Sequence, residues 1–301
     1  MVRRSPQRTK GMAYASLRTA SAARKKAPLS TLWEILAHLA KLAPSSYVPF
    51  GDVDGVQVGI SDEAKQKRIQ VAAAAVCLDV TVPVVVRCGE LGATLLIAHR
   101  SPFSQPIQRL TGLAHMVLQQ LLKRNITVYV LHYSWATVDG GLNDVLAHVL
   151  GFEVTDVFKT PIGETVIPLG RACRVPKETT LKALIQHVAK RLEAPSITYV
   201  GNLDDEVERL IIVAGDGITR DWLQLAWEEG YDTYLTGTLN HELATQASQL
   251  KLKVIAAPQA VTEIPGMSRL TQILRVEHPQ TTFTFIDPSP PYSTFFAAGR
   301  T

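Results

Sequence analysis

The apolar run over residues 94–98 ends abruptly in His99-Arg100-Ser101-Pro102, and this feature constrains the fold more than any other. A short apolar run bounded by polar and turn residues is typical of a strand buried in a sheet. In open α/β sheets, ligands bind at the carboxyl ends of the strands. His99 therefore lies where a functional site is expected, although a single histidine after a strand is more often a hydrogen-bonded structural residue than a ligand.

Strands and helices alternate along the rest of the chain, which predicts the α/β fold class. The segment 81–92 begins with Thr81 and Pro83, as helices do, and lies between strand candidates at 69–79 and 94–98. These three segments predict a right-handed βαβ unit. Further strands are predicted at 55–59, 125–132, 196–200, 210–214, 231–235 and 254–257, and further helices at 31–42, 113–123, 140–150 and 179–193.

The domain organisation follows from the breaks in this alternation. Thr31-x-x-Glu34 has the form of a capping box and begins the folded part. Residues 152–169 are interrupted by two prolines and a glycine, which predicts a linker. The predicted boundaries are a basic leader at 1–30, a first α/β lobe at 31–151, a linker at 152–169, a second α/β part at 170–290 and a tail at 291–301.

Basic residues are concentrated in the leader. Residues 1–30 hold eight Arg and Lys and no acid, and removing these charges from the formal net charge of +4 leaves the remaining chain near −4. An Arg-rich, Ser-rich, acid-free leader without an apolar centre is typical of a transit peptide, so we expect mitochondrial localisation. The alternatives are an unstructured basic tail on a cytoplasmic protein and a nucleic-acid-binding arm. The nucleic-acid-binding arm is disfavoured, because the acidic remainder of the chain offers no basic patch that would extend the binding surface.

Two further classes are excluded by composition. No apolar run approaches the ~18–20 residues of a membrane span, so no membrane association is expected. Cys77, Cys88 and Cys173 form no C-x-x-C pair, which argues against a zinc knuckle or a disulfide framework and for a reducing compartment. Their simplest role is that of small buried apolar residues.

Two polar turns are open to more than one interpretation. Asp52 and Asp54 either bond their own backbone, as turn aspartates commonly do, or line a site. The turn Gly215-Asp216-Gly217 follows a predicted strand and either cradles an anion or allows close packing of strand and helix.

Six segments, taken together, resemble the NIF3-like family (NGG1-interacting factor 3, also named GTP cyclohydrolase I type 2 homologues). They are Asp52-x-x-Gly55-Val56-Gln57-Val58-Gly59, Leu78-Asp79-Val80-Thr81, His99 with Pro106-Ile107-Gln108-Arg109-Leu110-Thr111, His132 with Gly140-Gly141-Leu142-Asn143-Asp144, Gly215-Asp216-Gly217 with Thr236-Gly237, and Gln259-x-x-x-Glu263. The resemblance implies two βα-rich lobes with a central cleft, to which the last strand and a 259–263 loop return.

The same resemblance implies a metallohydrolase that forms homo-oligomers, often hexameric rings. Its two divalent ions are held by two adjacent histidines, the aspartate that ends an H-T-N-x-D motif, and a late histidine and glutamate four residues apart. Mixed histidine and carboxylate ligands suit zinc, iron or manganese, and a paired site can activate a bridging water.

Only two of the five implied ligand positions keep a ligand here. His99 and Glu263 match the first histidine and the glutamate, whereas the other three positions hold Arg100, Ala136 and Gln259. Arginine stays protonated, has no lone pair to donate and repels a cation. We therefore expect the di-metal site to be lost and no cofactor to be bound. We also expect Arg100 to pair with Glu263, so that the carboxylate is not left buried without a counter-ion.

Three more residues are candidates for lining the cleft: Asp79, His132 and His241. For Asp79 and His132, ordinary hydrogen bonding at a strand end explains their position equally well. The expected function is a non-catalytic scaffold or a regulatory or assembly subunit with protein partners. The alternative is a hydrolase or cyclohydrolase acting on a nucleotide or other small molecule, at one metal held by His99, Glu263 and a residue such as His132 or His241. Nucleic-acid binding ranks lowest, given the acidic remainder of the chain.

Overall fold

The computed structural model describes residues 28–49, 52–103, 105, 107–287 and 291–292. The predicted transit peptide lies almost wholly outside these residues, as does most of the predicted tail. None of the helices in the described part of the chain combines the length and the apolarity of a membrane span.

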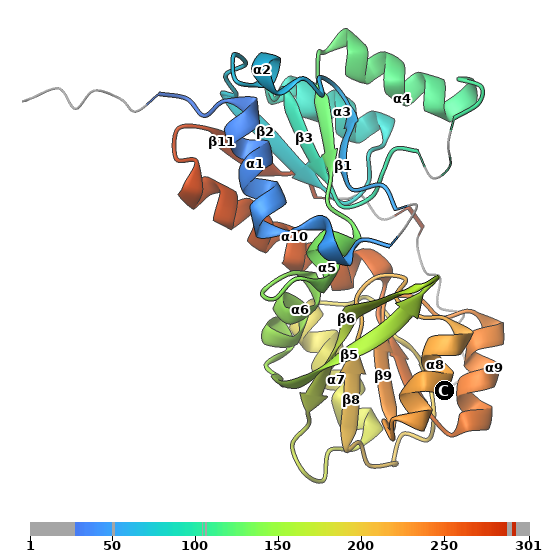
Figure 1. The fold of residues 1–301 in the computed structure, drawn as a ribbon. Coiled ribbons are helices and arrows are strands. Elements are labelled where there is room, and N and C mark those ends of the chain that lie inside the picture. Colours follow the sequence, from blue (N-terminus) through green and yellow to red (C-terminus); the bar gives the residue numbers. More distant parts are fainter. Residues whose placement is uncertain (1–27, 50–51, 104, 106, 288–290, 293–301) are drawn as a thin grey trace, which may run out of the picture.

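Two sheets organise the fold and confirm the α/β class (Figure 1). The strands of the first sheet are β1 (Gly55–Val58), β2 (Ala73–Cys77), β3 (Leu95–Ala98), β4 (Thr127–Val130) and β11 (Thr282–Phe285), in the order β1-β4-β3-β2-β11. Those of the second sheet are β5 (Glu153–Ile162), β6 (Thr165–Arg174), β7 (Thr198–Val200), β8 (Arg209–Ile212), β9 (Thr233–Thr236) and β10 (Lys253–Ala256), in the order β5-β6-β8-β9-β10-β7.

Helices connect and cover the strands. They are α1 (Leu32–Leu42), η1 (Ser45–Tyr47), α2 (Glu63–Gln66), α3 (Val82–Glu90), α4 (Gly112–Lys123), α5 (Tyr133–Thr137), α6 (Leu142–Leu150), α7 (Leu181–Leu192), α8 (Arg220–Glu228), α9 (His241–Leu250) and α10 (Gln259–Glu277). The expected capping box is present in α1, where the Thr31 hydroxyl accepts from the Glu34 N–H and the Glu34 carboxylate accepts from the Thr31 N–H.

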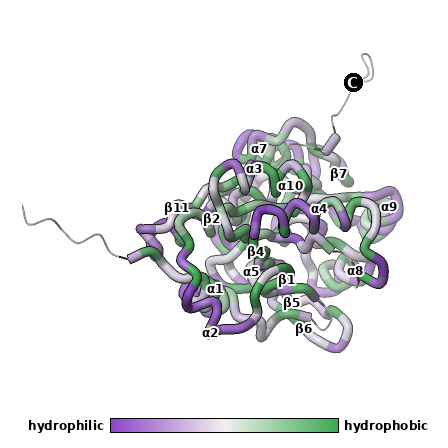
Figure 2. The backbone as a smooth tube through the Cα atoms, turned by 90° about the horizontal axis from the view of Figure 1, so that it is seen from above, coloured by the Kyte–Doolittle hydropathy of each residue, from purple (hydrophilic) through white to green (hydrophobic). Residues whose placement is uncertain are grey.

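The predicted βαβ unit is the centre of the first sheet. β2, β3 and β4 are parallel neighbours, and α3 connects β2 to β3. Leu95 and Ile97 pack into one core cluster and Leu96 and Ala98 into another, on opposite faces of the sheet. Burial on both faces explains why the run is continuously apolar instead of alternating. Seen from above, apolar stretches such as β4 lie at the centre and the polar α2 at the edge (Figure 2).

Residues 152–169 are not a linker. They form most of a long antiparallel hairpin, β5–β6, whose second strand pairs with β8 of the second sheet. Pro161 lies in β5, the edge strand, where a missing N–H is tolerated. Only Phe158 and Thr160 of β5 are fully buried, so the strand lacks the apolar alternation by which strands are recognised.

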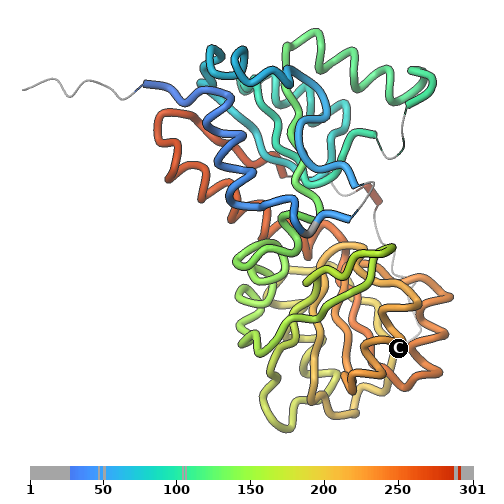
Figure 3. The backbone as a smooth tube through the Cα atoms, in the orientation of Figure 1, coloured from blue at the N-terminus to red at the C-terminus, as the bar shows by residue number. Residues whose placement is uncertain are grey.

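Residues 259–263 are not a loop either. They form the first turns of α10, a helix of 19 residues that contains Pro265. Packing stabilises the helix despite the proline, since Gly266 lies against Leu142, and the Trp135 indole donates to the Gly266 carbonyl at 3.3 Å. α10 then leads back to the first sheet, where β11 pairs with β2 at the edge (Figure 3).

Candidate functional site

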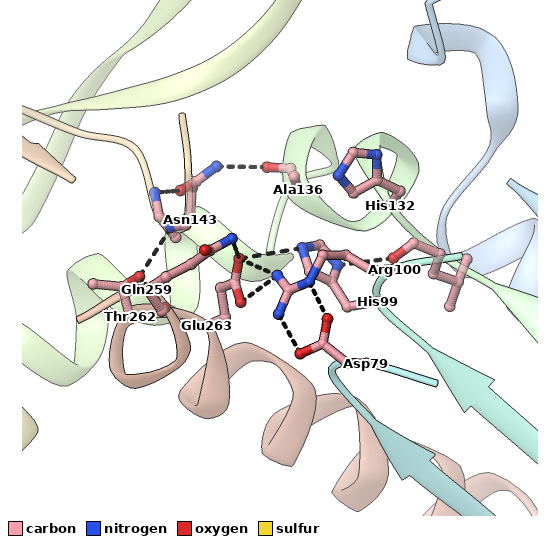
Figure 4. Close-up of polar contacts among 12 residues, drawn as sticks. Asp79, His99, Arg100, His132, Ala136, Asn143, Gln259, Thr262 and Glu263 are labelled. Carbon is pink, nitrogen blue, oxygen red and sulfur yellow. Dashed lines mark hydrogen bonds and ion pairs between the residues drawn. The ribbon is translucent and has the colours of Figure 1, made fainter. Parts of the chain in front are cut away.

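The parallel strands of the first sheet bring several polar residues to one end of that sheet. Asp79 follows β2, His99 and Arg100 follow β3, and His132 follows β4, so neighbouring strands deliver them side by side. The first turns of α10 place Glu263 opposite them (Figure 4). Sequence order alone separates these residues widely, and the sheet register brings them together.

Arg100 is the centre of this group. Its Nη1 donates to both carboxylate oxygens of Glu263 at 2.6 Å, as expected from the sequence. Its Nε and Nη2 donate to the two oxygens of Asp79 at 2.6 and 2.9 Å, a contact that the sequence did not indicate. Burial lowers the pKa of Arg100, but the bonds to Asp79 and Glu263 outweigh burial and raise it, so the guanidinium stays charged. Each nitrogen of the Arg100 guanidinium thus donates to a carboxylate.

His99 is a neutral imidazole in this arrangement. It is 4% exposed, and its Nδ1 lies 3.0 Å from the carbonyl oxygen of Leu131. A carbonyl only accepts, so Nδ1 carries the proton and Nε2 keeps its lone pair. Burial, together with the positive charges of His132 and Arg100, holds the pKa of His99 well below its usual value. Nε2 lies 3.9 Å from Glu263 Oε1, which is too long for a hydrogen bond.

His132 forms an ion pair with Asp52. Its Nδ1 lies 3.0 Å from Asp52 Oδ1, and the neighbouring Asp54 accepts the backbone N–H groups of His132 and Ser134 at 2.6 and 3.2 Å. The two aspartates therefore hold the start of α5. Burial lowers the pKa of His132, but the hydrogen bond and charge of Asp52 outweigh it and raise the pKa. For Asp52, burial raises the pKa, but the hydrogen bond and charge of His132 outweigh burial and lower it.

The Asp52→Asn substitution is expected to lower the pKa of His132, because burial then acts without the opposing carboxylate. An NMR titration of the imidazole signals measures this pKa, with Asp62→Asn as an exposed control. Since the folded-state pKa of His132 is raised, the pair contributes stability below the unfolded value of about 6.5, and this contribution is lost as the pH rises through the folded pKa. An unchanged pKa in Asp52→Asn would show that the pair is not formed.

Buried polar residues that sequence reasoning missed fix the surrounding loops. Asn143 donates to the carbonyls of Ala136 and Leu169 at 2.9 and 2.8 Å and accepts from the Ala214 N–H at 2.7 Å. The hydroxyl of Thr262 accepts from the Gly215 N–H at 2.9 Å. The sequence signal for the hydrogen bonding of Asn143 was its place in the segment 140–144, which resembles a family motif.

The Gly215→Ala substitution is expected to cost about 2 kcal/mol: about 1 for a left-handed backbone and about 1 for overpacking. Gly215 has φ +73°, and a Cβ there would lie 2.3 Å from Glu263 Oε1. Gly151→Ala is the matched control, with φ +78° and open space around its Cβ, and is expected to show the backbone cost alone. Urea unfolding measures both. Equal losses in the two variants would contradict close contact between Gly215 and Glu263.

A cavity of about 420 Å³ opens beside this group. His99 and His132 line it from the ends of β3 and β4, Ala136 from α5 and Glu263 from α10. Residues of β5, β6, the β8–α8 connection and α8 line the other side. Asp79 lies behind Arg100 and is not among the lining residues. His241 begins α9, is exposed, and is likewise not among the residues that line this cavity.

Residues 30–290 match the family model described as Duf34/NIF3 (NGG1p interacting factor 3). The chain belongs to the DUF34/NIF3 family. Two NIF3-family relatives named GTP cyclohydrolase 1 type 2 homolog, from Clostridium perfringens and Methanocaldococcus jannaschii, are each 26% identical over 245 and 242 residues. These alignments cover 79% and 80% of this chain and 89% and 93% of the relatives.

Solved structures share the NIF3 fold. A Bacillus cereus protein related to NIF3 superposes with a TM-score of 0.76 at 19% identity, over 89% of this chain and 100% of that chain. Reduced HcgD from Methanocaldococcus jannaschii superposes with a TM-score of 0.72 at 23% identity, over 86% of this chain and 98% of that chain. At these identities the likeness concerns the fold.

The side chains at the implied metal position do not fit a pair of metal ions. Both carboxylate oxygens of Glu263 accept hydrogen bonds from Arg100. The Gln259 Nε2 amide also donates to Glu263 Oε1, at 3.4 Å. Ala136 has no ligand atom. Within the described ranges, no group of three or more His, Cys, Asp or Glu side chains is arranged to hold a metal ion.

Proposed function

We propose that this chain is a NIF3-family protein that has lost the di-metal site and acts as a non-catalytic scaffold or as a regulatory or assembly subunit. The observation that carries the proposal is the Arg100 guanidinium, which bonds to Glu263 at 2.6 Å in the position that the family pattern assigns to a metal ligand. A fixed positive charge there balances the buried carboxylate that a cation would otherwise balance.

Electrostatic repulsion supports the loss of metal. A divalent ion about 4 Å from the guanidinium would be repelled by about 8 kcal/mol at an effective dielectric constant of about 20. A complete structural zinc site provides roughly 10–16 kcal/mol. Because only two of the five ligand positions are kept, the remaining donors provide only part of that energy, and the repulsion opposes them.

A turnover assay tests the proposal against its main alternative, a divalent-metal-dependent hydrolase acting on a nucleotide or other small molecule. The alternative is favoured by the exposed lone pair of His99 Nε2 beside the cavity and by the names of the relatives. The full chain is incubated with GTP or p-nitrophenyl phosphate and added Mn²⁺. We expect no hydrolysis above buffer with Mn²⁺. Mn²⁺-dependent turnover that is lost in His99→Ala and kept in the exposed control His115→Ala would contradict the proposal.

The setting of this function is inferred in the same way. We infer that the chain forms a homo-oligomer, as the family resemblance implies, and that residues 1–30 direct it to mitochondria, with a cytoplasmic location as the alternative. Light scattering after size exclusion tests the first point. A fluorescent protein fused after residue 30 tests the second, and diffuse cytoplasmic signal would contradict it.

The net charge of residues 31–301, near −4, disfavours nucleic acid as a partner.

A further inference from the structure

The cavity beside Arg100 is lined by hydrogen-bond acceptors and negative charges. Among the described residues that line it are three carboxylates, Asp216, Asp221 and Glu263, and no lysine or arginine. Glu263 is balanced by Arg100, and the positive charge of His132 is balanced by Asp52. The charges that remain facing the cavity are therefore negative.

His99 adds an acceptor that lacks a donor. His99 is 4% exposed and lines the cavity. Its proton is used on the Leu131 carbonyl, so Nε2 offers a lone pair, and Glu263 Oε1, at 3.9 Å, is itself an acceptor. Because His99 lines the cavity, this lone pair can accept a hydrogen bond from a donor that binds there.

Asp216 supplies a second acceptor nearby. It follows β8 in the turn before α8, is exposed, and its carboxylate makes no ion pair with any residue in the described part of the chain. It is close enough for its charge to raise the pKa of His132, Tyr133 and Glu263. Asp216 and His99 therefore both offer acceptor atoms to the same cavity.

The remaining walls are apolar. Trp222 and Tyr133 line the cavity together with aliphatic residues such as Leu142, Leu169 and Val213. The Trp222 indole N–H donates to the Pro161 carbonyl at 3.1 Å, so the ring offers an apolar surface to a ligand. Aromatic faces attract cations as well as apolar groups.

We propose that this cavity binds an organic cation, a molecule with an ammonium or amidinium group on an aromatic or aliphatic body. The cationic group donates to His99 Nε2 and Asp216, and the body packs against the apolar walls with Trp222. This inference rests on the proposed metal-free centre, because a metal ion on Glu263 would add positive charge and use the same acceptors. A bare metal ion suits the cavity less well, since it would need at least three converging ligands.

Benzamidine, benzamide and benzoate form a matched set of probes that differ mainly in charge. Binding to the full chain in EDTA-containing buffer is measured by NMR, with the Trp222 indole signal reporting the location. We expect benzamidine to bind at least about tenfold more tightly than benzamide, and benzoate not to bind, because only the amidinium pairs with Asp216. Asp216→Asn is expected to weaken benzamidine binding about tenfold. Asp204→Asn changes an exposed acid in the β7–β8 connection, before β8 begins, whereas Asp216 follows the end of β8; it is expected to leave binding unchanged.

Equal affinity for benzamidine and benzamide, or equal affinity of Asp216→Asn and the unsubstituted chain for benzamidine, would overturn the inference. Two outcomes separate it from the proposed function. If benzamidine fails to bind and the protein also fails to bind Mn²⁺ in EDTA-free buffer, only the organic-cation site is refuted. If Mn²⁺ binds one-to-one and displaces benzamidine, the metal-free centre is refuted, and the inference that rests on it is overturned.

Discussion

The Arg100→Met substitution is expected to lower the free energy of unfolding by about 3 kcal/mol, the lower end of the range for breaking a buried ion pair. The carboxylate of Glu263 is 1% exposed and would lose its only charged donor among the described residues, whereas Asp79, at 47% exposed, can be solvated by water. The loss therefore comes mainly from Glu263. Chemical denaturation monitored by circular dichroism measures it.

Two further variants show whether Glu263 is the cause. Arg100→Met combined with Glu263→Gln is expected to recover most of the loss, because the charge that was left without a partner is removed. Arg220→Met breaks an exposed ion pair with Glu242, at 66% and 63% exposure, and is expected to change stability by less than about 0.5 kcal/mol. A double variant as unstable as Arg100→Met alone would contradict this account of Arg100.

The Arg171→Met substitution is expected to cost about 4 kcal/mol, within the range for breaking a buried ion pair. Arg171 is 1% exposed and donates to both oxygens of Asp144 at 2.7 and 2.8 Å. It also donates to the carbonyls of Pro168 and Thr137 at 2.9 and 3.0 Å, and so joins β6 to α5 and α6. Removing the guanidinium takes this donor from both carbonyls and leaves Asp144 with the Gly140 N–H at 2.9 Å.

Arg171→Lys is expected to recover less than half of that loss, because an ammonium cannot reproduce the planar fork. The matched control is Arg174→Met, three residues further along the same strand, where the side chain is 72% exposed and pairs with an equally exposed Glu153. Its effect is expected to stay below about 0.5 kcal/mol. If Arg171→Met is as mild as Arg174→Met, the buried network does not join these elements.

The sequence predicted those parts of the fold that depend on local rules. The capping box of Thr31, the strand that ends at His99 and the helix that begins after Thr81 were all expected from neighbouring residues. These three features depend on neighbouring residues and not on long-range packing. The pairing of Arg100 with Glu263 was expected because the family resemblance places both residues at one site, where a buried carboxylate needs a counter-ion.

The sequence failed where packing overrides local preference. The hairpin at 152–169 consists of residues whose order suggested a linker, but β6 is held by β8 on one side and β5 on the other. α10 continues through Pro265 because Gly266 fits against Leu142. The contact of Arg100 with Asp79 required the register of β2 and β3, which no local pattern specifies.

The metal content of the purified full chain tests the central claim most directly. The protein is produced in medium containing zinc, iron and manganese and is measured by inductively coupled plasma mass spectrometry. The triple variant Arg100→His, Ala136→Asp and Gln259→His, which restores the implied ligand set, serves as the comparison and is expected to gain metal. We expect fewer than about 0.1 metal ions per unsubstituted chain, because Arg100 occupies the position of a ligand. One or two metal ions per unsubstituted chain would contradict the account.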